Sequence, residues 1–252
     1  MWASIPFLVG AALGADEPED QYRYLAGLAD RGLHDLVVAE ARVFLAEHPR
    51  HARADRARFH LGESLFALER FGEAGPEFER LDRSQGFEFA VEVDFRRGQC
   101  SLEQGAADAA EPAFEAVLAA GDGYLTVPAT FLLGEARLRS GEPAKASERY
   151  RQVLAAEPEG EFADDAAHGL VWCARSVDDH AATVAAAGQF LGRFADDGRA
   201  SEVWLLRGEA ELELGAFEEA LTSYSRTRGA EHASASLRGR AFALAGLGRH
   251  AD

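Results

Sequence analysis

The sequence predicts an all-α protein built as a solenoid of stacked helix–turn–helix repeats, and three observations lead to that prediction. Ala and Leu dominate the hydrophobic residues, which make up 47% of the 252-residue chain, while β-branched residues are few. This composition favours helices over strands. A pattern of small and large residues recurs along the chain, and no long alternating run typical of a strand is present. No single copy of the pattern can bury its own apolar face, so the copies are expected to stack.

A glycine recurs inside the first helix expected in each copy. A second marker, the apolar residue near the end of each second helix, gives the same period independently. The glycines are Gly62, Gly98, Gly134, Gly169 and Gly208, at steps of 36, 36, 35 and 39 residues; the second markers are Phe44, Leu81, Val117, Val153 and Phe190, at steps of 37, 36, 36 and 37.

Each copy combines this glycine with a small and a large residue on the second helix. A glycine inside a helix costs about 1 kcal/mol relative to alanine, so its recurrence indicates close packing of two helices. The small residues are Ala74, Ala110, Ala146 and Ala220, and the large ones, four positions later on the same helix face, are Phe78, Phe114, Tyr150 and Tyr224. Turns are expected at Gly105, Gly141 and Gly215, and Pro49 and Pro158 are expected to end second helices.

These features resemble the tetratricopeptide repeat, whose usual period of about 34 residues is slightly longer here. The resemblance covers residues 22–252 and implies a right-handed superhelical solenoid, with about five repeats and a partial sixth after a cap-like first copy at 22–49. The segment FLAEHPRHARADRARFHLGESLF at 44–66 is similar to one branch of the family. That branch comprises envelope proteins of Gram-negative bacteria, typified by the Tol–Pal-associated periplasmic coordinator and the outer-membrane assembly lipoprotein.

Two copies depart from the pattern. The fourth, at about 160–195, has a longer turn at 176–180 and an Ala-rich second helix, so we expect looser packing and a flexible joint there. The last copy ends part-way into its second helix, and we expect it to expose an apolar face or to be capped by a partner.

The N-terminal residues predict export from the cytoplasm. Residues 1–15 are apolar and uncharged, which suits a signal peptide, and residues 16–21 are expected to form an acidic linker. The predicted location is therefore the periplasm or cell envelope, with no stable membrane insertion once the signal is removed. No basic residue precedes Arg23, which a mis-assigned start codon or an uncleaved apolar segment would explain. The alternative to export is a cytoplasmic scaffold cut from a longer chain.

The formal net charge of −17 argues against nucleic acid or an anionic membrane as the main partner, because the summed field repels phosphate. A protein or peptide with a basic and apolar face is the natural complement. The simpler alternative is that the acidity only keeps a repeat protein soluble. The oligomeric state stays open.

The family resemblance implies that first helices line a concave protein-binding groove. An acidic or amide row flanked by phenylalanines would suit a peptide carrying Arg or Lys and apolar anchors; the alternative is an ordinary solvated helix face. By register, the candidate groove residues are Arg56, Phe59, Glu63, Phe95, Gln99, Phe131, Glu135, Leu205 and Glu209. The carboxylate clamp of chaperone-binding members is excluded, because it needs Lys and Asn and this chain has no Asn and only Lys145.

No motif predicts an enzyme, a cofactor or a metal site. Neither a nucleotide-binding glycine loop nor a nucleophile elbow is present, and His48 and His51 lack a third ligand nearby. Cys100 and Cys173 lie two repeats apart, too far for a disulfide, and are expected to be buried. One further alternative is that the chain is the repeat portion of an enzyme whose catalytic domain lies outside this sequence.

Overall fold

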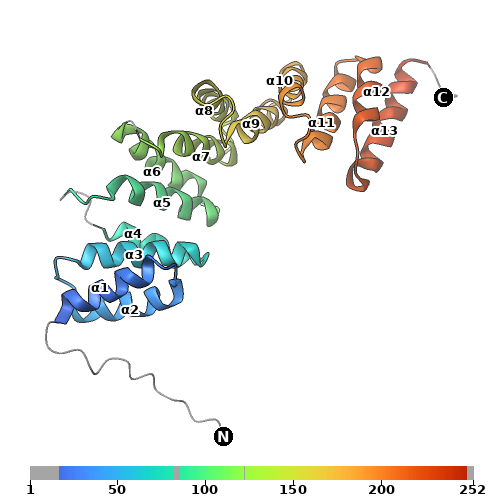
Figure 1. The fold of residues 1–252 in the computed structure, drawn as a ribbon. Helices are drawn as coiled ribbons and strands as arrows, with labels where there is room; N and C mark the ends of the chain where they lie inside the picture. Colours follow the sequence, from blue (N-terminus) through green and yellow to red (C-terminus); the bar gives the residue numbers. More distant parts are fainter. Residues whose placement is uncertain (1–16, 82–85, 122, 249–252) are drawn as a thin grey trace, which may run out of the picture. The chain divides into compact units, whose positions relative to one another are not determined.

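The computed structural model describes residues 17–81, 86–121 and 123–248, and the regular secondary structure of these residues is entirely α-helical (Figure 1). The chain divides into two compact units, residues 1–106 and 107–252. The boundary falls between the two helices of the copy that the sequence places at 95–118. Within each unit the helices pack as consecutive antiparallel hairpins, so the predicted all-α class and hairpin repeat are confirmed.

The first unit consists of two helical hairpins and a fifth helix that packs on the second hairpin. Its helices are α1 (Glu17–Ala29), α2 (His34–Glu47), α3 (Ala54–Ala67), α4 (Phe71–Glu79) and α5 (Ala90–Glu103). Their facing sides form one core, which includes the fully buried side chains of Leu25, Phe44 and Phe78.

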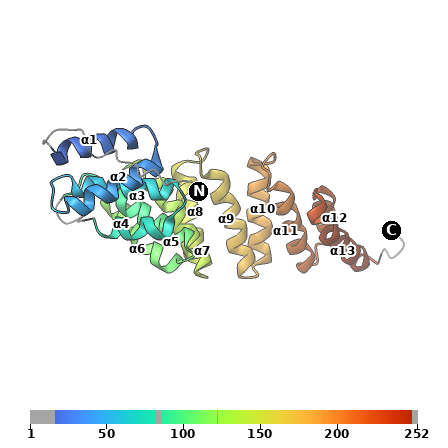
Figure 2. The same ribbon diagram turned by 90° about the horizontal axis from the view of Figure 1, so that it is seen from below.

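The second unit contains eight helices in its described part, and Figure 2 shows α9 to α13 side by side in chain order. They are α6 (Ala107–Ala120), α7 (Thr126–Arg139), α8 (Pro143–Ala156), α9 (Ala163–Ser176), α10 (His180–Arg193), α11 (Ala200–Glu213), α12 (Phe217–Arg226) and α13 (Ala230–Gly246). First helices of successive copies also touch directly, as α11 and α13 do, so each copy buries its apolar face against the next.

Turn residues and prolines set the helix boundaries largely as predicted. Gly141 and Gly215 adopt φ angles of 76° and 73°, the left-handed conformation that lets a chain reverse direction between two helices. Helices α2 and α8 end two residues before Pro49 and Pro158, because the residue preceding a proline is driven out of the helical conformation.

The aromatic residue of a second helix lies between two first helices, and glycine makes room for it on both sides. A Cβ at Gly134 would lie 2.9 Å from Cε1 of Tyr150, and one at Gly169 would lie 2.6 Å from its Cε2. Tyr224 is enclosed in the same way by Gly208 and Gly239. The recurring glycines therefore have the packing reason that the sequence predicts.

The acidic linker expected at 16–21 is wrong for residues 17–21, which form the start of α1. Acidic side chains are favourable in the first turn of a helix because they face its positive end, and a proline fits there because its missing N–H would have no partner. Glu19 also forms an ion pair of 3.3 Å with Arg53 at the start of α3.

The looser packing expected in the fourth copy is also wrong. Helices α9 and α10 each span fourteen residues, and Val171, Ala187 and Phe190 are fully buried between their neighbours. Val171 is the ninth residue of α9, where α7 and α11 carry the marker glycine, and Ala187 is the eighth residue of α10, where α8 and α12 carry tyrosine. In this copy the larger residue lies on the first helix and the smaller one on the second, so together they still fill the space between the two helices.

Two expectations concern the ends of the chain. Residues 1–15, the expected signal segment, lie outside the described residues. None of the described helices is both long and apolar enough to cross a membrane. Helix α13, in the last copy, exposes 63% of Leu237 and 66% of Phe242, which is the apolar face expected there.

Candidate protein-binding groove

All nine candidate groove residues lie on first helices, as the register predicts: α3 carries Arg56, Phe59 and Glu63, α5 carries Phe95 and Gln99, α7 carries Phe131 and Glu135, and α11 carries Leu205 and Glu209. The first five belong to the first unit and the other four to the second.

In the first unit, the acidic and amide side chains of the row are already bound by an arginine of the chain. Arg96 donates two hydrogen bonds to Glu63, of 2.8 and 3.1 Å, and a third of 2.8 Å to Gln99. Arg56 pairs with Glu88 at 2.7 Å. The predicted row is thus neutralised within the unit, because Arg96 lies on the next first helix and faces back toward Glu63.

The phenylalanines of the first unit are packed against other side chains and present little surface for binding. Phe59 stacks on Phe89 at a centroid distance of 4.7 Å and also contacts Phe87 and Phe78. Phe95 is only 8% exposed. The expectation that these rings flank an open groove is therefore not met in this unit.

In the second unit, neighbouring side chains cover Phe131 and pair with Glu135, as happens to the candidates of the first unit, and Leu205 is buried. Phe131 stacks on Phe162 at 5.1 Å, and Leu205 is only 9% exposed. Glu135 accepts a hydrogen bond of 2.5 Å from the hydroxyl of Tyr150 and lies 3.6 Å from Arg139. Burial is the main cause that raises the pKa of Tyr150, so this hydroxyl stays protonated and donates.

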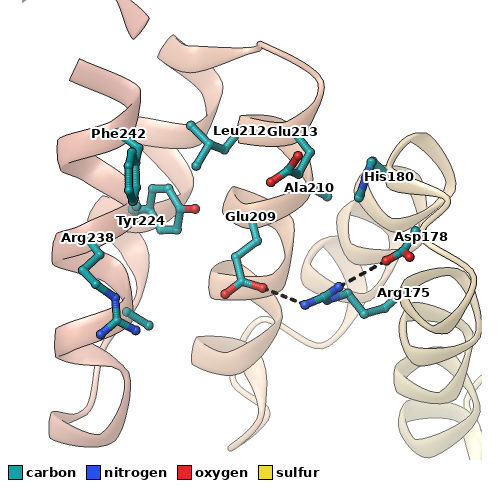
Figure 3. A pocket seen from close by; sticks show the side chains of 12 residues that line it. Arg175, Asp178, His180, Glu209, Ala210, Leu212, Glu213, Tyr224, Arg238 and Phe242 are labelled. Carbon is teal, nitrogen blue, oxygen red and sulfur yellow. Dashed lines mark hydrogen bonds and ion pairs between the residues drawn. The ribbon is translucent and has the colours of Figure 1, made fainter. Parts of the chain in front are cut away.

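Glu209 differs from its counterpart Glu135, because it borders an open cleft. The cleft has a volume of about 560 Å³ and is lined by α9, α11, α12, α13 and the start of α10. Figure 3 shows Glu209 reaching toward Arg175, which also reaches Asp178; the two ion pairs measure 3.4 and 3.7 Å. Of the nine candidates, only Glu209 lines this cleft.

The hydroxyl of Tyr224 has no such carboxylate bound to it among the described contacts, although Tyr224 and Glu209 are spaced in sequence as Tyr150 and Glu135 are. The tyrosine passes between Gly208 and Gly239 and lines the cleft (Figure 3). Burial, followed by the charge of Glu209, raises the pKa of Tyr224 to about 12. It therefore offers a neutral hydrogen-bond donor at neutral pH.

Sequence reasoning missed two exposed aromatic residues on first helices of the second unit. Trp172 is the tenth residue of α9, the position that Glu135 and Glu209 hold in α7 and α11, and it is 37% exposed. Phe242 holds the same position in α13. Gly239 contacts Tyr224 as Gly169 contacts Tyr150, and each glycine is followed three positions later by the exposed aromatic residue.

The signal that could have found these residues is the register of the fourth and last copies. Aligning the last copy on Gly239 displaces α13 by two residues, as aligning the fourth copy on Gly169 displaces α9. Aligning the fourth copy on Val171 instead places Trp172 directly in the row. The row of the second unit thus alternates between acid and aromatic: Glu135, Trp172, Glu209 and Phe242.

The residues considered for metal binding and redox chemistry have structural roles. Within the described part of the chain, no three His, Cys, Asp or Glu side chains are grouped to hold a metal ion. The rings of His48 and His51 pack on Phe44 at 5.5 and 5.6 Å. Cys100 and Cys173 are free and buried, and burial raises the pKa of their thiols to about 11 and about 12.

Comparisons with known proteins agree with this architecture. The family model "Tetratricopeptide repeat" matches residues 174–236. No curated protein matches the sequence significantly.

Three solved structures illustrate the similarity in fold. A tetratricopeptide repeat protein from Parabacteroides merdae has a TM-score of 0.59 at 11% identity, covering 90% of this chain and 98% of that one. PilW, a type IV pilus biogenesis factor, has a TM-score of 0.59 at 14% identity, covering 89% and 98%. MamA from Desulfovibrio magneticus has a TM-score of 0.59 at 18% identity, covering 73% and 98%. The chain therefore has the fold of tetratricopeptide-repeat solenoids, and its residues 174–236 match the sequence model of that repeat.

Proposed function

We propose that this protein is a non-enzymatic scaffold that binds another protein in the cleft between α9, α11 and α13. The observation that carries the proposal is that this cleft is bordered by an aromatic ring, Phe242 on α13, that is 66% exposed. Trp172 holds the equivalent position on α9, next to the cleft-lining part of that helix in sequence but not itself among the lining residues. Rigid, exposed aromatic side chains around a concave site are typical of the residues that dominate binding energy in protein interfaces.

The proposal moves the binding site away from most of the residues that the sequence first indicates. The acids of the first unit are paired and its phenylalanines are packed, which favours an ordinary helix face there. In the second unit Glu209 keeps a place in the proposed site, together with Tyr224 and Phe242, which the sequence did not single out as binding residues.

The experiment uses the full chain as bait, with photo-crosslinking to locate bound proteins. We expect the double variant Trp172→Ala/Phe242→Ala to capture its partners at least about tenfold less well, because truncating interface aromatics typically costs 2 kcal/mol or more. The matched control is Leu36→Ala/Val43→Ala, which removes two apolar side chains that are 49% and 46% exposed on α2. Equal capture by both double variants, with unchanged helicity, would contradict the proposal.

We also propose that the scaffold is exported and acts in the bacterial cell envelope. The support is the uncharged apolar segment 2–15 and the similarity of 44–66 to envelope proteins. Cleavage after Ala15 would leave α1, which begins at Glu17, intact. Fractionation with N-terminal sequencing tests this: a mature start at Asp16 in the periplasm is expected, and an intact Met1 in the cytosol would favour the cytoplasmic alternative.

A further inference from the structure

The chain repeatedly holds its own arginines between an aromatic ring and a carboxylate. The guanidinium of Arg96 lies 4.5 Å from the centroid of Phe66 while it donates to Glu63 at 2.8 Å. This geometry combines cation–π attraction with charge-assisted hydrogen bonds. Two further arginines are placed alike: Arg53 between Tyr22 and Glu19, and Arg207 between Trp204 and Glu211.

The cleft of the second unit presents the same components without an arginine between them. Phe242 on α13 and Glu209 and Glu213 on α11 all line it. Among the described residues, no guanidinium lies over the Phe242 ring and no cation pairs with Glu213. Both side chains are exposed, so a group entering from outside meets an open ring face and a free carboxylate.

Arg175, the cation that pairs with Glu209 in the described part of the chain, is held weakly. Its ion pair with Glu209 is 3.4 Å long, and the two side chains are 39% and 38% exposed. Solvent and salt screen a pair with this exposure, so it contributes little to stability. Arg175 also has Asp178 as a second partner, so a competing cation at Glu209 would displace it at little cost.

The remaining arginine of the cleft does not block such a cation. Arg238 donates to the hydroxyl of Ser234 on its own helix at 3.3 Å, and Figure 3 shows its guanidinium pointing away from the Phe242 ring. The formal charge of −17 also attracts cationic segments from a distance.

We propose that the cleft binds an arginine side chain of the partner protein, stacked on Phe242 and hydrogen-bonded to Glu209 and Glu213. Arginine suits the site better than lysine, because its planar guanidinium stacks on a ring while it donates to two carboxylates. The inference rests on the proposed function and adds the chemistry of the side chain that is recognised.

The probe is a fluorescein-labelled, acetylated Leu-Arg-Leu-Arg-Leu peptide, titrated against the full chain by fluorescence anisotropy at low ionic strength. The comparison peptide carries citrulline in place of arginine, which keeps the shape and removes the charge. We expect the citrulline peptide to bind about tenfold more weakly, as for the loss of a close charge pair. Equal binding of the two peptides, or no binding of the arginine peptide, would overturn the inference.

Variants locate the binding. Glu209→Gln and Glu213→Gln are each expected to weaken the arginine peptide about threefold. Phe242→Leu, which keeps an apolar surface without a ring, should weaken it about two- to fivefold, corresponding to an exposed cation–π contact. The matched control Glu219→Gln removes an exposed charge on α12, outside the cleft, and should leave binding unchanged. If it weakens binding as much as Glu213→Gln does, attraction to the overall charge explains the binding and the inference fails.

This failure is distinguishable from failure of the proposed function. If the arginine peptide does not bind, but capture of natural partners still depends on Trp172 and Phe242, the scaffold role stands and only the arginine assignment is lost. If capture is also insensitive to both aromatic residues, the proposed function fails as well.

Discussion

The ring of Tyr150 occupies the space that a side chain at Gly169 would need, since a Cβ there would lie 2.6 Å from both Cε2 and Cζ of the ring. The tyrosine belongs to α8 and the glycine to α9 of the next copy. Their contact is therefore a joint between successive repeats. It also explains why a residue that weakens a helix is placed in the middle of α9.

Gly169→Ala tests this joint. Helix propensity alone would stabilise the protein by up to about 1 kcal/mol, but overlap with the buried ring is expected to lower the free energy of unfolding by about 2 kcal/mol. Urea unfolding followed by circular dichroism measures the difference. The control is Gly188→Ala in α10, where the nearest atom to an added Cβ is 3.9 Å away; it should stabilise. If the Gly169→Ala variant is as stable as the wild type, the Tyr150 ring moves aside at no cost in unfolding free energy, which would contradict the prediction.

The exchange of large and small residues in the fourth copy predicts non-additive effects. Ala187→Tyr should destabilise by about 2 kcal/mol, because Val171 fills the space that glycine leaves free in other copies. Val171→Gly should destabilise by a similar amount through a cavity and a weaker helix. The double variant reproduces the arrangement of α7 and α8 on the α9 side only, because Leu206 on α11 holds the position that Gly169 holds in α9. It should still be more stable than the sum of the two changes. Simple additivity in a double-mutant cycle would show that the positions do not share one space.

A non-glycine residue in the α3–α4 turn carries removable strain. Glu69 adopts a φ of 57°, where the α7–α8 turn has Gly141 at 76°. A left-handed conformation costs an L-residue roughly 1–2 kcal/mol, so Glu69→Gly should raise the unfolding free energy by about 1 kcal/mol. Gly141→Ala should lower it by a comparable amount. Thermal unfolding measures both, and a destabilised Glu69→Gly variant would show that the turn carries no strain.

The network around Arg199 predicts a dependence of stability on pH. Hydrogen bonds from Arg199 hold the pKa of Asp197 well below its usual range. A carboxyl group with a lowered folded-state pKa stabilises the protein above its unfolded pKa, near 3.9, and loses that contribution as the pH falls further. Asp197→Asn should therefore cost about 2 kcal/mol at pH 7, and the difference from wild type should shrink below about pH 4. The control is Asp196→Asn, at an exposed neighbouring position; a pH-independent difference for Asp197→Asn would contradict this origin.

The hairpins could be predicted from the sequence because each depends on residues close together in the chain. The glycine at 134, the alanine at 146 and the tyrosine at 150 are read from spacing alone, and Tyr150 contacts Gly134 as that spacing requires. The fourth copy misled the prediction, because Val171 and Ala187 meet the same volume requirement with the opposite residue types. The sequence pattern shows which residue type stands at each position, whereas packing depends on the combined volume of the two facing side chains.

The candidate site was less accessible to sequence reasoning. Whether Glu63 is free depends on Arg96, 33 positions later, and on the side from which α5 presents it. The net charge of the chain does not contain that information. Trp172 and Phe242 were missed because aligning the fourth and last copies on Gly169 and Gly239 displaces α9 and α13 by two residues each. The groove position is then assigned to Leu170 and Arg240 instead.

Tyr224 fills the gap between α11 and α13 and also lines the cleft. Fraying of α13 would carry Gly239 away from the ring and remove one wall of the binding site. Occupancy of the cleft and opening of the C-terminal helix are therefore thermodynamically opposed. A bound partner should slow amide hydrogen exchange throughout α13, including residues that it never touches.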